Sequence, residues 1–184
     1  IGATETGEQL ALQIKSHEEL GIRFKGIFDD RAPSRLPNAT HSDLKGSISD
    51  AIELAKKNNL PEQLIDFIRT HHGTSTVQYF YRSYLSNFPE GELDKEHFSY
   101  PGPKPFTKEL AVLMMADSVE AASRSLQEYT AESVGKLVDG IIDYQFNEGQ
   151  FDSANITLRD ISEVRAIFKK KLLNIYHVRM EYPT

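Results

Sequence analysis

The sequence of 184 residues contains no cysteine, so disulfide bonds and thiolate metal sites are excluded. Any metal site must therefore use nitrogen and oxygen ligands. No apolar run approaches the roughly 20 residues that a membrane-spanning helix needs, so we expect no direct membrane insertion. The first residues lack both the basic segment of a signal peptide and an initiator Met. We expect a soluble, cytoplasmic fragment of a longer protein.

An excess of basic residues is also missing. Lys and Arg number 21 against 27 Asp and Glu, which gives a formal net charge of -6. Because non-specific binding to nucleic acid depends on a basic surface, DNA or a long RNA is not expected as a partner. Local basic groups could still hold a small phosphorylated ligand. The 39% hydrophobic content is enough for the core of one ordinary domain or of two small ones.

Residues 1–46 have the character of an α/β unit. Residues 4–17 predict a short helix, and the alternation of apolar residues over 22–28 predicts a strand that ends in an acidic pair. The following stretch is rich in Pro, Ser, Asn and Asp, which is typical of a loop. These residues therefore predict a small N-terminal α/β appendage.

Residues 47–184 are predicted to be almost entirely helical. Pro61 suits the first position of a helix, and Thr157 with Asp160 forms a variant of the capping box. The pattern predicts a mainly α-helical bundle with a long proline-rich loop at 89–105. The expected helices cover residues 47–59, 61–72, 76–88, 106–126, 130–149 and 157–177.

Two adjacent histidines, His71 and His72, come at the end of the Pro61 helix. Neutral imidazoles are good ligands for transition metals. Two successive helical residues point roughly 100° apart, so two neighbouring metals could take one histidine each. The alternative is a surface pair, or a pair stabilised by the dipole at the helix end.

Asp117 belongs to the most apolar of the predicted helices. A carboxylate on that helix is expected to be desolvated, which is costly unless a cation or hydrogen-bond donors compensate. A metal ion is one such cation. A plain ion pair with Arg124, two turns further on, is the alternative.

The stretches IDFIRTHHGTS, YFYRSY, FSYPGPKPFTKE, MMADSVEAASRSL and GQFDSANITLRDI occur in this order along the chain. Together they resemble the intracellular HD domain of the bacterial seven-helix membrane receptors that hydrolyse cyclic di-AMP. The resemblance runs from about Ala51 to Pro183. It implies an HD-domain-like bundle in which a dinuclear centre of Mn or Fe activates a water that attacks a phosphodiester and releases pApA.

By this resemblance the metal ligands are His71, His72 and Asp117. Residues implied to bind the cyclic dinucleotide are Phe80 and Tyr81, by stacking on adenine, and Thr74, Lys104 and Arg124, through phosphate oxygens. The alternatives remain open: core packing for the two aromatic residues, a turn residue for the threonine, a solvated lysine and a structural arginine.

The histidines that the family has upstream are missing. No His-Asp dipeptide occurs in this chain, and the only histidines before His71 are His17 and His41. A further family histidine is expected at or next to Ser47, where none is present. The resemblance therefore predicts an incomplete bundle, an impaired metal centre and slow turnover. The alternative to an impaired enzyme is a non-catalytic module that binds nucleotide or dimerises.

Residues 1–59 resemble something different, namely the Rossmann-like domain of the transferases that move a sugar phosphate to undecaprenyl phosphate. The turn at residues 2–7, the strand end at 28–31 and the strand-to-helix segment at 44–59 carry this resemblance. A third possible function is therefore a regulatory domain of such a transferase. Two family fragments joined near residues 51–59 predict a chimera.

Overall fold

The computed structural model describes residues 5–16, 24, 26–29, 43–88 and 95–177. Most of the predicted loop before residue 43, together with His17 and His41, lies outside the described residues. The chain divides into two compact units, residues 1–69 and residues 70–184, which are described separately below. The domain boundary between residues 46 and 47, which followed from the change from an α/β pattern to a helical one, stays a prediction.

The first unit contains a two-stranded parallel sheet. Strand β1 (Ile27–Phe28) pairs with β2 (Leu44–Gly46), and Ile27 is fully buried against Phe24 and Leu44. The helices of this unit are α1 (Glu5–Ser16), α2 (Ile48–Lys57) and α3 (Glu62–Thr70). A capping box between Ser47 and Asp50 begins α2 directly after β2. This order of helix, strand, strand and helix confirms the small α/β appendage.

Among the described residues of the predicted strand at 22–28, only Ile27 and Phe28 belong to β1. Gly26 has a φ of +148°, and a Cβ atom there would lie 2.3 Å from the Lys45 side chain. The backbone of Gly26 thus passes close to β2 in a conformation that favours glycine. The alternating sequence pattern did not reveal this interruption, because it reports side-chain burial and not the backbone conformation of one residue.

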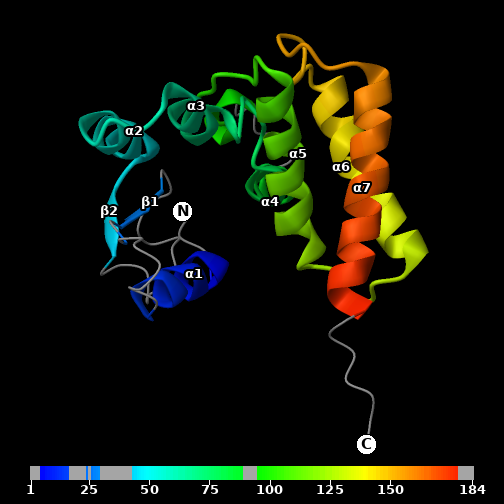
Figure 1. Ribbon diagram of the computed structural model, residues 1–184. Coiled ribbons are helices and arrows are strands. Elements are labelled where there is room, and N and C mark those ends of the chain that lie inside the picture. The colour runs from blue at the N-terminus through cyan, green and yellow to red at the C-terminus, as the bar shows by residue number, and fades with distance from the viewer. Residues whose placement is uncertain (1–4, 17–23, 25, 30–42, 89–94, 178–184) are drawn as a thin grey trace, which may run out of the picture. The chain divides into compact units, whose positions relative to one another are not determined.

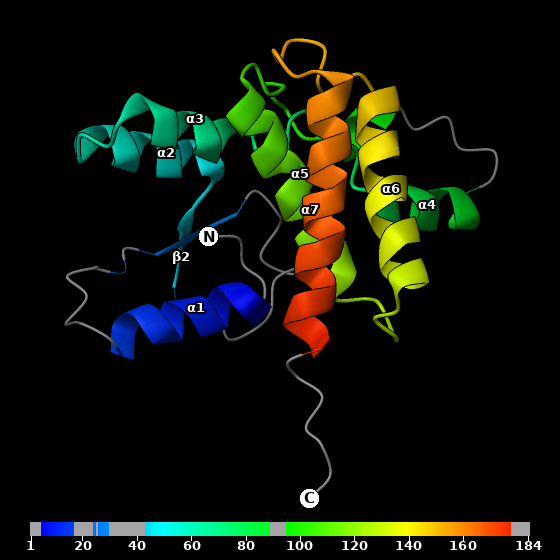
Figure 2. The same ribbon diagram turned by 45° about the vertical axis from the view of Figure 1, so that its right-hand side comes forward.

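The second unit is a helical bundle, which confirms the mainly α fold class. Helices α5 (Lys108–Ser123), α6 (Ala131–Asn147) and α7 (Leu158–His177) pack side by side (Figures 1 and 2). Their shared core contains Ala111, Met114, Met115, Val119, Val134, Val138, Ile142, Phe151, Ile161 and Leu172. Two shorter elements, α4 (Gln78–Asn87) and the 3-10 helix η4 (Lys95–Phe98), precede α5.

The ends of α6 and α7 follow their sequence signals. Thr130 caps α6 through the backbone N–H of Ser133, and Thr157 with Asp160 forms the predicted capping box of α7. Gly149, with a φ of +64°, follows the last turn of α6. In the part of the chain that the structure describes, no helix is long and apolar enough to cross a membrane.

Candidate metal and nucleotide site

His71 and His72 lie in a turn, because α3 ends at Thr70 rather than at the predicted position two residues later. Their ring centroids are 4.0 Å apart with planes tilted by 42°, so the two imidazoles contact each other. The ring of His72 stacks on Tyr100, with centroids 4.2 Å apart and planes 23° from parallel. Tyr100 thus restricts the orientation of the His72 ring.

The loop that follows the histidines is tied to the segment that carries Tyr100. The backbone N–H of Tyr100 donates to the carbonyl of Ser75, and Thr76 forms an antiparallel bridge with Ser99. The Ser75 hydroxyl donates to the carbonyl of His72 at 2.7 Å. The segment at residues 71–77, called the histidine loop, is therefore held to residues 99 and 100 directly after its turn.

Asp117, in the middle of α5, lies next to His72. The distance from His72 Nδ1 to Asp117 Oδ2 is 3.7 Å. The Asp117 side chain is 43% exposed, so it lies at the edge of the core and is less buried than the sequence predicted. The apolar character of α5 comes mainly from its other faces, where Met114, Met115 and Val119 are buried.

The partial burial of Asp117 raises the pKa of its carboxyl above the usual range. Glu120 adds to this increase in pKa, whereas the positive charges of His71 and Arg124 act against it. A carboxylate with a raised pKa next to imidazole nitrogens is typical of sites that bind cations or transfer protons.

The residues around Asp117 fit one cation better than two. Two donor atoms that are each about 2.1 Å from one ion are roughly 3.0 Å apart at a right angle and roughly 3.4 Å apart at the tetrahedral angle. The His72–Asp117 distance of 3.7 Å is close to this range. Among the described residues, however, no group of three His, Cys, Asp or Glu side chains is arranged to hold a metal ion. The dinuclear centre that the resemblance implies does not fit this donor set.

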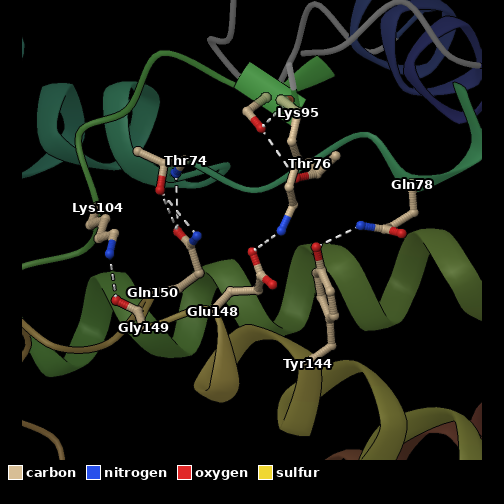
Figure 3. A network of polar contacts seen from close by, with 10 residues as sticks. Thr74, Thr76, Gln78, Lys95, Lys104, Tyr144, Glu148, Gly149 and Gln150 are labelled. Atoms are coloured by element: carbon tan, nitrogen blue, oxygen red, sulfur yellow. Dashed lines mark hydrogen bonds and ion pairs between the residues drawn. The ribbon is translucent and has the colours of Figure 1, made fainter. Parts of the chain in front are cut away.

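The residues predicted to bind phosphate all contact other residues of the protein. Figure 3 shows Lys104 Nζ donating to the Gly149 carbonyl at 2.9 Å, and the Thr74 backbone N–H donating to Gln150 Oε1 at 3.0 Å. Arg124 makes a bidentate ion pair with Glu120, one turn earlier on α5. The structure therefore shows these three side chains in structural contacts, and their contacts with substrate stay a prediction.

The two aromatic residues predicted to stack on adenine lie on α4. The Tyr81 ring is tilted against Phe98, with centroids 5.5 Å apart. Phe98 also contacts Tyr84, whose ring stacks on Phe88. The side chain of Phe80 lies outside the described residues. Packing between aromatic rings is thus one role of Tyr81, and stacking on a base stays a prediction.

Sequence reasoning missed the role of Gln150. This side chain is 2% exposed and contacts the histidine loop through Thr74. It belongs to the stretch GQFDSANITLRDI, which contributes to the resemblance to the HD domain but did not indicate a role for this glutamine. No local pattern marks a glutamine as buried, because its partner lies 76 residues away.

The chain is similar to two curated phosphodiesterases over most of its length. It is 37% identical over 147 residues to the cyclic-di-AMP phosphodiesterase PgpH of Listeria monocytogenes, which covers 80% of this chain and 20% of that protein. It is also 37% identical over 135 residues to PgpH of Bacillus subtilis. The chain thus spans about a fifth of the length of these relatives.

A solved structure shows the same fold. The crystal structure of the L. monocytogenes PgpH HD domain in complex with cyclic-di-AMP has a TM-score of 0.66 and 38% identity, and the match covers 73% of this chain and 62% of that chain. A second crystal structure of the same domain gives a TM-score of 0.63.

A family model described as a CoA-binding domain matches residues 1–72. Because 72 and 147 residues together exceed the 184 of the chain, this match overlaps the region aligned with the Listeria protein. The two matches therefore share a segment of the chain. Over 73–80% of its length the chain is homologous to PgpH, and it shares the mainly helical fold of the PgpH HD domain.

Proposed function

We propose that residues 47–184 are the C-terminal part of an HD-type phosphohydrolase domain that binds a cyclic dinucleotide and hydrolyses it slowly. The observation that supports this proposal most directly is the pair of His72 and Asp117, 3.7 Å apart at the edge of a helical bundle. Homology to phosphodiesterases that act on cyclic di-AMP suggests the substrate. In this proposal residues 1–46 derive from a Rossmann-like domain, and the chain acts on the cytoplasmic side of a membrane.

His72 and Asp117 are the residues that would hold one divalent cation, Mn or Fe, with His71 as a third donor from the adjacent turn position. When bound, such a cation would neutralise charge on a phosphate oxygen and acidify a water molecule. Tyr100 orients the imidazole of His72 by stacking on it. In this proposal Phe80 and Tyr81 contact the bases. Thr74 contacts phosphate through its hydroxyl while its backbone N–H stays bonded to Gln150, and Lys104 and Arg124 contact phosphate after releasing their present partners.

Turnover is expected to be slow because the upstream histidine and His-Asp donors that the family has for a second cation are missing from this sequence. No His-Asp dipeptide is present in the sequence, and the family ligand expected near Ser47 is absent. One side of the phosphate charge is then left without a counter-ion. Each such loss removes several kcal/mol of transition-state stabilisation, and about 1.4 kcal/mol already corresponds to a tenfold change in rate.

The test is to incubate the chain with Mn²⁺ and cyclic di-AMP and to quantify pApA by chromatography. We expect turnover orders of magnitude below about one per second, an ordinary enzymatic rate. Turnover at that ordinary rate, abolished by His72→Ala, would show that other residues complete the centre and would overturn the proposed impairment.

Equilibrium dialysis with Mn²⁺ alone tests the ion site without substrate. We expect at most one ion per chain, and Asp117→Asn should weaken its binding by about 10-fold or more, since it removes a charged ligand. Asp143→Asn is the matched control, because Asp143 is a surface carboxylate on α6 that pairs with Arg165. Two ions per chain, or equal losses in both variants, would contradict the proposed site.

A binding module without catalysis is the second candidate. It is favoured by the absence, among the described residues, of any group of three metal-binding side chains. In this case cyclic di-AMP binds equally well with and without Mn²⁺, and no pApA forms. Binding that depends on Mn²⁺ would favour the slow phosphohydrolase instead.

A further inference from the structure

The turn that follows α6 contacts both segments that surround the histidines. This turn consists of Glu148, Gly149 and Gln150, and we call it the α6 turn. Lys95 Nζ pairs with Glu148 Oε2 at 2.5 Å, and Lys104 Nζ donates to the carbonyl of Gly149 (Figure 3). Gln150 contacts Thr74, so consecutive residues of the α6 turn hold one residue of η4 and two loop residues, Lys104 and Thr74.

Gln150 is the buried member of this turn. Its Oε1 accepts the backbone N–H of Thr74 at 3.0 Å, and its Nε2 donates to Thr74 Oγ1 at 3.1 Å. The backbone N–H of Gln150 donates to the carbonyl of Gln145, which fixes the turn to the end of α6. Because a buried amide without partners costs about 1–3 kcal/mol, Gln150 and Thr74 each require the other.

Hydrogen bonds within the histidine loop connect the residues next to Thr74 with His72. Ser75 donates through both its backbone N–H and its hydroxyl to the carbonyl of His72. Between His72 and Thr74, Gly73 has a φ of +54°, and a Cβ atom there would lie 2.5 Å from Gln150 Oε1. The loop backbone thus passes directly over the Gln150 amide, one residue after the histidine that faces Asp117.

We propose that Gln150 is a positioning residue for the cation site. It holds the histidine loop at Thr74 and thereby places the His72 imidazole opposite Asp117. The inference rests on the proposed function for the nature of the site, but the contact itself is independent of any ion. Partners that orient metal ligands typically contribute 10–100-fold in affinity, which sets the size of the expected effect.

Gln150→Leu tests this role, because leucine has a similar size and removes all the side-chain hydrogen bonds. Gln145→Leu is the matched control: Gln145 is also buried on the same end of α6, but its amide donates to Ser118 and to the Met114 carbonyl. Two measurements are made on each variant: amide hydrogen exchange by NMR, and Mn²⁺ binding followed by the electron paramagnetic resonance of free Mn²⁺.

In Gln150→Leu we expect the Thr74 amide to exchange at least about 10-fold faster while core amides such as Val138 keep their protection, and Mn²⁺ affinity to fall about 10-fold. In Gln145→Leu both quantities should stay within about twofold. An unchanged Thr74 exchange rate, or equal losses of affinity in the two variants, would overturn the proposal.

A milder pair of variants covers the case in which Gln150→Leu does not fold. Thr74→Val removes the hydroxyl at nearly constant size, and Thr74→Ser keeps it. We expect Thr74→Val to weaken Mn²⁺ binding several-fold and Thr74→Ser to retain it; equal affinities would overturn the positioning role. If the unsubstituted chain binds no Mn²⁺, the ion site of the proposed function fails, while the exchange rate of the Thr74 amide still decides whether Gln150 holds the loop.

Discussion

Gly73→Ala is expected to destabilise the second unit, because Gly73 combines a left-handed backbone with close contacts. Its φ is +54°, and a Cβ atom there would lie 2.5 Å from Gln150 Oε1 and 3.2 Å from Met114 Cε. An L residue other than glycine in this conformation costs about 1–2 kcal/mol. Displacing Gln150 weakens its hydrogen bonds with Thr74, at about 0.5–1.5 kcal/mol each.

The sum of these effects is a loss of about 2–5 kcal/mol in the free energy of unfolding. For a chain of this size, each kcal/mol corresponds to roughly 2–4 °C, so the melting temperature should fall by about 4–20 °C. The measurement is urea denaturation followed by far-ultraviolet circular dichroism, with thermal unfolding as a second measure.

Gly140→Ala is the matched control, because it makes the same chemical change in the interior of α6. Apart from the neighbouring residues and the backbone of its own helix, no atom lies within 4 Å of the position of its Cβ atom. Alanine there restricts the unfolded chain and favours the helix, so we expect a gain of about 0.5–1 kcal/mol. A change in the same direction for both variants, or a loss below about 0.5 kcal/mol for Gly73→Ala, would refute the reasoning.

Two further predictions concern the bundle. Ile142→Ala should lower the free energy of unfolding by about 2–5 kcal/mol in a urea titration, because Ile142 is fully buried; Ile167→Ala, 54% exposed on α7, should change it by less than about 0.5 kcal/mol. The ammonium of Lys108 and the cap at Thr157 lower the pKa of Asp160, so its stabilising contribution is complete above the unfolded pKa of about 3.9 and is lost as the pH falls further. Asp160→Asn should therefore melt below the unsubstituted chain near neutral pH, with a difference that shrinks below about pH 4; a constant difference would contradict this assignment.

Most helices were predictable from the sequence, because their signals are local. Thr130 caps α6, and the spacing of Val134, Val138 and Ile142 places one face of that helix in the core. The capping box at Thr157 began α7 as predicted. These signals involve residues that are close together in the sequence, so they can be recognised without knowing the fold.

The sequence and the tertiary structure each contributed to identifying the candidate site. The residue types of His71, His72 and Asp117, and their resemblance to a known motif, were visible in the sequence. Their approach was not, since the Nδ1–Oδ2 distance of 3.7 Å joins residues 45 positions apart. The exposure of Asp117 also differed from expectation, because the hydrophobic character of a helix does not say which of its residues lies at the edge of the core.

Only the tertiary structure decided what Thr74, Lys104 and Gln150 contact. The sequence suggested phosphate as the partner of the first two, whereas both are bonded to the α6 turn. A buried polar group must find a partner, but the sequence does not say which of many distant groups it will be. Chain order therefore determined the helices and their caps, and the packing of α5, α6 and the histidine loop determined which polar side chains meet.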